Sequence, residues 1–179
     1  MRIYWSQTFK RHVNSPGHPE SPDRLDAVMN AIGDAHEIME PPPAEKSALS
    51  KVHDPAYIDR IADFCTRGGG AIDPDTGASP ASFEAAVKAA GAGIHAVNAA
   101  AAGELKRAFC AVRPPGHHAE KDRAMGFCIF NNIAVAAEQA VEKGFCKPAI
   151  VDFDVHHGNG TQHTFYRRGD ILYISLHQY

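Results

Sequence analysis

Three short apolar runs, separated by two helical stretches, constrain the fold of this chain more than any other feature. The runs have the composition of buried strands and cover residues 108–112, 149–155 and 171–176. The patterns at 131–143 and 161–167 between them are typical of helices. Because parallel strands need a crossover connection, this order predicts an α/β fold in which helices flank a parallel sheet.

The residues before 108 add further strands and helices. Ser21 and Pro22 have the preferences of a helix cap and a first helical turn, while Gly91 and Gly93 lower the helix propensity of the segment around them. The expected elements are a strand over 1–5, a helix over 21–35, a short extended segment over 49–52, a helix over 54–66, a surface loop over 72–80 and an alanine-rich helix over 81–102.

Size and composition narrow the class of protein. A chain of 179 residues with 44% hydrophobic residues can build one core, so we expect a single domain over 1–179. It has no apolar run long enough for a bilayer and no signal-peptide pattern, which predicts a cytoplasmic protein. A net charge of -3 argues against a direct nucleic-acid partner, and four widely spaced cysteines predict free thiols.

The first chemical motif is the segment RPPGHHA at 113–119, directly after a predicted strand. Prolines and a glycine stiffen this loop, so His117 and His118 are held in fixed directions. Ligands of parallel sheets bind beyond the carboxyl ends of the strands, where this loop would lie. A functional pair and two structurally satisfied histidines both remain open readings at this point.

The second motif follows the next predicted strand. On a strand, Asp152, Asp154 and His156 would point to one side, while Phe153 and Val155 would point to the other. Carboxylates inside a parallel sheet are costly unless they are paired or bind a cation. The pattern therefore favours a metal site, and a hydrated polar strand end is the alternative.

Several segments together resemble a known family. They are RPPGHHA at 113–119, GFCIFNN at 126–132, DFDVHHGNGTQ at 152–162, ISLHQ at 174–178, HPESPDRL at 18–25 and SPASFEAAVKAAG at 79–91. In this order they resemble the histone deacetylase and acetylpolyamine amidohydrolase superfamily, and GNGTQ is most similar to its class II and bacterial branches. The resemblance implies an arginase/deacetylase-like fold.

The resemblance also implies roles for the two motifs. Asp154 and His156 would be zinc ligands, and His117 and His118 would handle the metal-bound water, with Asp152 orienting His117. Zinc with an open coordination position polarises an amide carbonyl and acidifies its water, which fits hydrolysis of acetylated lysine or acetylpolyamine.

Further residues receive roles by the same resemblance. Asn159 stands where some relatives have an aspartate partner of the second histidine, and it would assist His118 in catalysis. Gly126 and Phe127 resemble the wall of an acyl-lysine tunnel. A potassium site is implied at Asp152, Ser175 and the backbones of Asp154, His156 and Leu176.

The position of the last residue shapes the functional hypothesis. In the family, a third zinc-binding aspartate and a tyrosine lie further downstream, whereas this sequence ends at Tyr179. We therefore expect the N-terminal half of the usual domain, low turnover in isolation, and association as a homo-oligomer or with a complementing second half. The alternatives are a non-catalytic binding or assembly module and a two-metal hydrolase of the arginase type, which would need more carboxylates.

Overall fold

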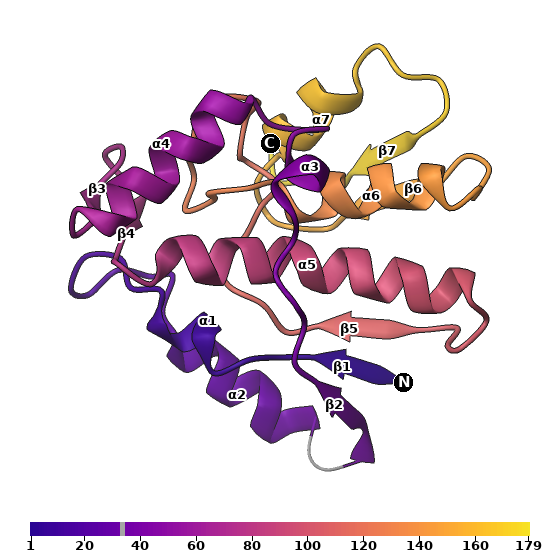
Figure 1. Cartoon of the computed structure of the whole chain (residues 1–179), viewed down its shortest axis with the longest axis horizontal. Helices are drawn as coiled ribbons and strands as arrows, with labels where there is room; N and C mark the ends of the chain where they lie inside the picture. The colour runs from indigo at the N-terminus through magenta and orange to yellow at the C-terminus, as the bar shows by residue number, and fades with distance from the viewer. Residues whose placement is uncertain (33–34) are drawn as a thin grey trace.

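The computed structural model describes residues 1–32 and 35–179 and has an α/β fold with parallel strands flanked by helices (Figure 1). One parallel sheet has the order β2-β1-β5, and a second parallel sheet pairs β6 with β7. The strands are β1 (Arg2–Tyr4), β2 (Glu37–Met39), β3 (Gly70–Ala71), β4 (Gly77–Ala78), β5 (Ala108–Cys110), β6 (Ala149–Asp152) and β7 (Leu172–Ser175).

Helix α5 is the longest element and packs against α6, with β5 along its other side (Figure 1). None of the helices within 1–32 and 35–179 combines the length and the apolar character needed to span a bilayer. The helices are α1 (Thr8–Arg11), α2 (Asp23–Ile32), α3 (Lys46–Leu49), α4 (Pro55–Thr66), α5 (Ser82–Ala101), α6 (Asn132–Glu142) and α7 (Asn159–Phe165).

Two apolar clusters hold these elements together. The larger joins α4, α5 and α6 around side chains such as Tyr57, Ile58 and Phe130. The smaller includes Ile3 of β1 and Leu25 of α2, together with alanines of α5. Since α5 contributes to both clusters, it fixes the first sheet relative to α6 and the loops that follow the strands.

The expected alanine-rich helix is confirmed, because α5 runs unbroken through Gly91 and Gly93. A Cβ atom on Gly91 would lie 2.0 Å from the carbonyl oxygen of Pro42, and one on Gly93 would lie 2.8 Å from the Cβ atom of Ala136. These glycines therefore allow the proline run and α6 to approach the helix closely.

Other expected elements need correction. Residues 49–52 are not extended: α3 ends at Leu49 and a hydrogen-bonded turn follows. The expected loop over 72–80 contains β4, the second strand of the β3–β4 hairpin. The strand expected over 149–155 ends at Asp152. The last helix begins at Asn159, and the expected end of the 21–35 helix includes residues 33–34, which lie outside the described residues. Strand β2 was not predicted from the sequence.

The face of the second sheet that points away from the core is exposed and apolar. Ile150 on β6 is buried, while its neighbour Val151 and the paired Ile174 on β7 are exposed. We call the exposed apolar side chains on these two strands and directly after them the apolar β6–β7 face; its members are Val151, Phe153, Val155, Leu172, Ile174 and Leu176. Parallel strands are usually covered on both sides, so this face lacks a partner among the described residues.

Candidate active site

Arg113 ties the base of the histidine loop to the N-terminal segment. Its guanidinium is fully buried and donates to the carbonyl oxygens of Phe9 and His12, each at 3.0 Å, and to Glu20 Oε2 at 2.6 Å. Burial alone would raise the pKa of Glu20, but hydrogen bonds from His12 and Arg113 lower it to about 2. The loop therefore starts from a charged, buried anchor.

His117 is oriented by a carboxylate. Its Nδ1–H donates to Asp152 Oδ2 at 2.9 Å, and the hydroxyl of Tyr173 lies 3.1 Å from the same oxygen. Gly158 makes room for this arrangement, because a Cβ atom there would lie 2.4 Å from both Asp152 Oδ2 and the Tyr173 hydroxyl. Asp152 is thus placed to hold the ring of His117 in one orientation.

His118, the second histidine of the pair, is held by the side-chain amide of Asn159. Its Nδ1–H donates to Asn159 Oδ1 at 2.7 Å, and its ring centroid lies 4.0 Å from that of His117. Burial lowers the pKa of His118, and the neighbouring imidazoles of His117 and His156 add to this effect while the bond to Asn159 opposes it. Lower basicity favours the neutral imidazole, which can accept a proton.

The strand alternation expected for Asp154 and His156 is wrong. Both residues follow the end of β6 and are positioned by successive turns in which side chains accept backbone N–H groups. Asp152 Oδ1 accepts from Asp154 N at 3.2 Å, and Asp154 Oδ1 accepts from His156 N at 2.8 Å. These local bonds replace the sheet ladder and leave the side chains of Asp154 and His156 48% and 70% exposed.

The two histidine segments nevertheless meet. His117 Nε2 lies 3.8 Å from Asp154 Oδ1, and the ring centroids of His118 and His156 are 6.0 Å apart. Burial would raise the pKa of Asp154, but the N–H of His156 and the nearby imidazoles lower it, so the carboxylate is ionised at neutral pH. An anionic oxygen and three imidazoles therefore share one region.

Asp154 and His156 have the chemistry and spacing of two ligands of one zinc ion. Tetrahedral bonds of about 2.0–2.1 Å place neighbouring ligand atoms about 3.4 Å apart. Asp154 Oδ1 and His156 Nδ1 are 3.3 Å apart. No group of three or more metal-binding side chains is arranged around one point in residues 1–32 and 35–179. These two residues fit such an ion as part of its ligand shell.

The residues expected to bind potassium lie at the ends of β6 and β7. The backbone N–H of Leu176 donates to the carbonyl oxygen of Asp152 at 2.8 Å. The hydroxyl of Ser175 lies 2.8 Å from His177 Nδ1 and 3.2 Å from His157 Nδ1, contacts that the sequence did not suggest. The Ser175 hydroxyl thus has imidazole partners.

Gly126 and Phe127 form a turn beside His118. Both have positive φ angles of 57° and 68°, and a Cβ atom on Gly126 would lie 2.4 Å from the ring of His118. The N–H of Phe127 donates to Thr76 Oγ1 at 3.0 Å, and that of Gly126 to Asp75 Oδ1 at 3.2 Å. The hairpin tip therefore holds the turn that brings Gly126 against the ring of His118.

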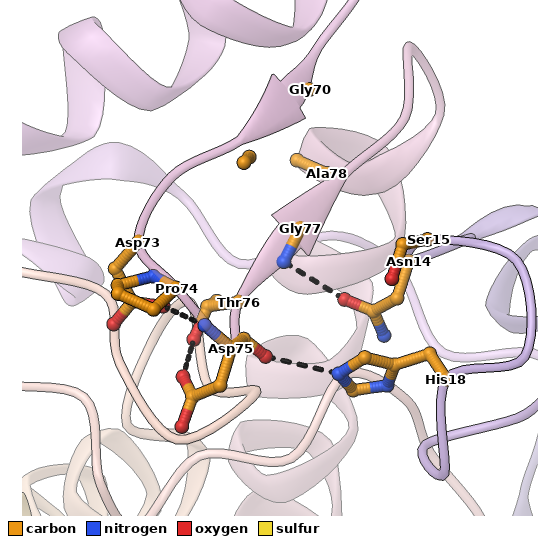
Figure 2. Close-up of a pocket in the computed structure, with 11 residues that line it drawn as sticks. Asn14, Ser15, His18, Gly70, Asp73, Pro74, Asp75, Thr76, Gly77 and Ala78 are labelled. Atoms are coloured by element: carbon orange, nitrogen blue, oxygen red, sulfur yellow. Dashed lines mark hydrogen bonds between the residues drawn. The ribbon is translucent and has the colours of Figure 1, made fainter.

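A cavity of about 210 Å³ lies between the β3–β4 hairpin and the segment that carries Asn14 and His18 (Figure 2). Figure 2 shows the side chain of Asn14 accepting from Gly77 N and His18 meeting the carbonyl oxygen of Asp75. Each of these hydrogen bonds is 3.0 Å long. His18 also packs edge-on against Phe127, with ring centroids 4.5 Å apart. None of the residues that line the cavity was predicted as a site residue, and it is distinct from the histidine pair.

Sequence reasoning missed two residues that contact the site. Tyr173 alternates with Ser175 on β7, so the period of that strand could have placed its side chain on the inner face beside Asp152. Glu120 accepts a hydrogen bond from the amide of Asn159 at 2.5 Å, and no local pattern in the sequence indicated this contact.

Comparisons with known proteins show the family of this chain. The profile of the histone deacetylase domain matches residues 18–179. The chain is 45% identical to a histone deacetylase-like amidohydrolase of Pseudomonas aeruginosa, covering 90% of this chain and 44% of that protein. It is 42% identical to a probable deacetylase of Methanothermobacter thermautotrophicus, covering 99% of this chain and 54% of that protein.

A solved structure also matches the fold of this chain. The crystal structure of an HDA15 HD domain superposes with a TM-score of 0.92 at 37% identity, covering 98% of this chain and 52% of that one. This chain thus spans about half the length of the proteins it matches. The chain belongs to the histone deacetylase family, whose members include histone deacetylase-like amidohydrolases.

Proposed function

We propose that this chain carries the histidine pair and two zinc ligands of a deacetylase site that hydrolyses the amide of acetylated lysine or acetylpolyamine. The convergence of the two histidine segments supports this most directly. His117 Nε2 lies 3.8 Å from Asp154 Oδ1, and the ring centroids of His118 and His156 are 6.0 Å apart. Water and the amide would yield acetate and a free amine.

In this proposal, zinc held by Asp154 and His156 supplies Lewis-acid chemistry when it is bound. The remaining chemistry belongs to the chain. Because Asp152 and Asn159 each accept from an Nδ1–H group, the Nε2 atoms of His117 and His118 are the positions that can accept and return a proton. Phe127, whose backbone N–H is held by Thr76, would line the path of an extended acyl-lysine side chain together with Gly126.

In this proposal, a third zinc ligand and an oxyanion donor come from outside residues 1–179. The exposed apolar β6–β7 face is where a second copy or a complementing second polypeptide would pack. A potassium ion at Asp152, Ser175 and Leu176, a single domain over 1–179 and a cytoplasmic location remain predictions from the sequence.

Acetate release tests the proposal. The purified chain would be loaded with zinc, its zinc content and assembly state measured by native mass spectrometry, and an acetyl-lysine peptide or an acetylpolyamine supplied. We expect acetate release that depends on zinc and is lost in His118→Ala. Turnover that survives this substitution would contradict the proposal. Peptide binding without turnover would favour the non-catalytic binding module instead.

A further inference from the structure

A chain of hydrogen bonds connects His118 to a carboxylate that the deacetylase chemistry above does not use. His118 Nδ1–H donates to Asn159 Oδ1 at 2.7 Å, and Asn159 Nδ2–H donates to Glu120 Oε1 at 2.5 Å. The same carboxylate also accepts from His163 Nδ1, which lies 2.8 Å from Oε1 and 3.0 Å from Oε2. The four side chains run from the histidine pair to the surface.

The carboxylate decides how the amide of Asn159 is oriented. An ionised carboxylate only accepts hydrogen bonds, whereas an amide has one accepting end and one donating end. If the amide were flipped, its oxygen would face the oxygens of Glu120 and an unfavourable contact would replace a charge-assisted bond. The NH₂ group also lies 3.4 Å from the carbonyl oxygen of His118, which favours the same orientation.

The amide orientation in turn decides the tautomer of His118. Because Asn159 presents an oxygen to Nδ1, that nitrogen must carry the proton, and the lone pair of a neutral ring is on Nε2. A flipped amide would present N–H groups to Nδ1 and favour the opposite tautomer. His117 needs no such arrangement, since the carboxylate of Asp152 contacts it directly at 2.9 Å.

Glu120 is itself held rigidly enough to act in this way. Its side chain is 14% exposed, and its backbone carbonyl accepts from His53 Nδ1 at 2.9 Å. Its backbone N–H donates to the carbonyl oxygen of Arg123 at 2.9 Å, so both peptide groups beside the side chain are fixed. The carboxylate itself is held by hydrogen bonds from Asn159 and His163.

We propose that Glu120 is a positioning residue for His118: through the amide of Asn159 it keeps the His118 ring in the Nδ1–H tautomer with Nε2 free to accept a proton. The role in turnover rests on the proposed deacetylase function, but the effect on the tautomer does not. Glu120 would act on His118 through the Asn159 side chain, whereas the carboxylate of Asp152 acts on His117 by direct contact.

The test is histidine-ring NMR on the full chain. Long-range ¹H–¹⁵N spectra distinguish the two tautomers, and the His118 signals are assigned by their absence in His118→Ala. We expect Nδ1–H for the unchanged chain, a mixture of tautomers in Glu120→Leu, and a retained Nδ1–H in Glu120→Gln, whose carbonyl can still accept from Asn159. The matched control is Glu142→Leu, which removes an exposed carboxylate paired with Lys51.

A second variant keeps the test valid if Glu120→Leu does not fold. In Glu120→Gln combined with Asn159→Asp, a carboxylate faces Nδ1 directly, and we expect the Nδ1–H tautomer to be retained, as in Glu120→Gln alone. An unchanged tautomer in Glu120→Leu, or a mixture in the double variant, would overturn the proposal. If zinc-loaded protein turns over, Glu120→Leu should lower kcat by roughly tenfold or more with KM little changed. Turnover that survives His118→Ala would refute the proposed function and leave the tautomer result intact.

Discussion

The buried pair of Arg113 and Glu20 shows how single residues far from the reacting groups determine where those groups lie. Arg113 starts the loop that carries the histidine pair, and Glu20 belongs to the segment before α2. Removing one partner of a buried ion pair leaves an uncompensated charge, which typically costs about 3–5 kcal/mol. The histidine loop thus depends on an N-terminal anchor.

Glu20→Gln should therefore lower the free energy of unfolding at neutral pH by about 3 kcal/mol. Since the pKa of Glu20 falls from 4.5 to about 2 on folding, its contribution is complete above pH 4.5 and is lost as the pH falls towards 2. Urea unfolding of both proteins between pH 7 and pH 2 would show the two stabilities approaching each other.

Glu142→Gln is the matched control for this prediction, because its carboxylate is half exposed and pairs with Lys51 at the surface. Surface pairs contribute about 0–1 kcal/mol, so little change in stability is expected. A constant difference between Glu20→Gln and the unchanged chain across the acid range would contradict the pKa assigned to Glu20.

At the residue scale, the sequence was informative where a motif packs several functional groups into a few positions. It pointed to His117, His118 and Asp152, which the structure brings together. It did not indicate Glu120, because the contact with Asn159 joins segments 39 residues apart and depends on the tertiary fold. Contacts between distant segments leave no periodic pattern in a single sequence.

At the scale of elements, the β3–β4 hairpin supports the turn that carries Phe127. Thr76 is buried, and its hydroxyl accepts the N–H of Phe127, a residue with φ of 68°. Thr76→Val keeps the shape but leaves that N–H unpaired, which should cost about 1–3 kcal/mol of unfolding free energy. Thermal unfolding would measure this loss.

Thr66→Val provides the comparison for the hairpin variant, since Thr66 is exposed and donates only to the carbonyl oxygen of Ala62 within α4. Its stability should stay within about 0.5 kcal/mol of the unchanged chain. Equal losses in the two variants would mean that the hairpin tip does not support Phe127.

Gly91→Ala tests the packing of α5. Alanine has a higher helix propensity than glycine by about 1 kcal/mol, so propensity alone predicts stabilisation. The added Cβ atom, however, would lie 2.0 Å from the carbonyl oxygen of Pro42, and we expect a net loss of about 1–3 kcal/mol instead. Chemical unfolding would decide between the two signs.

Gly169→Ala is the reference for this substitution, because a Cβ atom there meets nothing within 4 Å and the φ angle is not positive. It should be neutral or slightly stabilising. Stabilisation by Gly91→Ala would show that the proline run can move away from α5 at little cost.

Element types were predictable where apolar spacing extends over many residues, as in α4, α5 and α6. The ends of elements were less predictable where side chains compete with the neighbouring strand for backbone hydrogen bonds. Asp152 and Asp154 accept backbone N–H groups just after β6, so a run that reads as one strand over 149–155 becomes a strand and two turns. That competition also moved two expected ligands from a strand to a turn.

At the scale of the whole molecule, the order of strands and helices predicted parallel pairing but not which strands are neighbours. β6 pairs with β7 as expected from their order, whereas β5 pairs with β1 and belongs to the other sheet. Strand neighbours depend on long-range packing, which the order of elements along the chain does not specify.

The apolar β6–β7 face makes association of the isolated chain the expected behaviour. Phe153, which is 84% exposed, and Leu172 belong to this face, and apolar patches of this kind are typical of contact surfaces. Analytical ultracentrifugation should show an average mass that rises with concentration, and the double variant Phe153→Lys, Leu172→Lys should remain monomeric over the same range.

Val13→Lys serves as the control for association, since Val13 is 50% exposed but lies outside the apolar β6–β7 face. It should associate like the unchanged chain. If the unchanged chain is monomeric at high concentration, or if all three proteins behave alike, this face does not drive association.

The turn that carries Asp154 and His156 has a consequence for the order of events during maturation of the protein. Neither side chain takes part in the two apolar clusters, and both are accessible to bulk solvent. We therefore expect the polypeptide to reach its native state first and to acquire or release an ion afterwards. A chelator such as EDTA should then leave the melting temperature almost unchanged, in contrast to small domains that need their metal in order to fold.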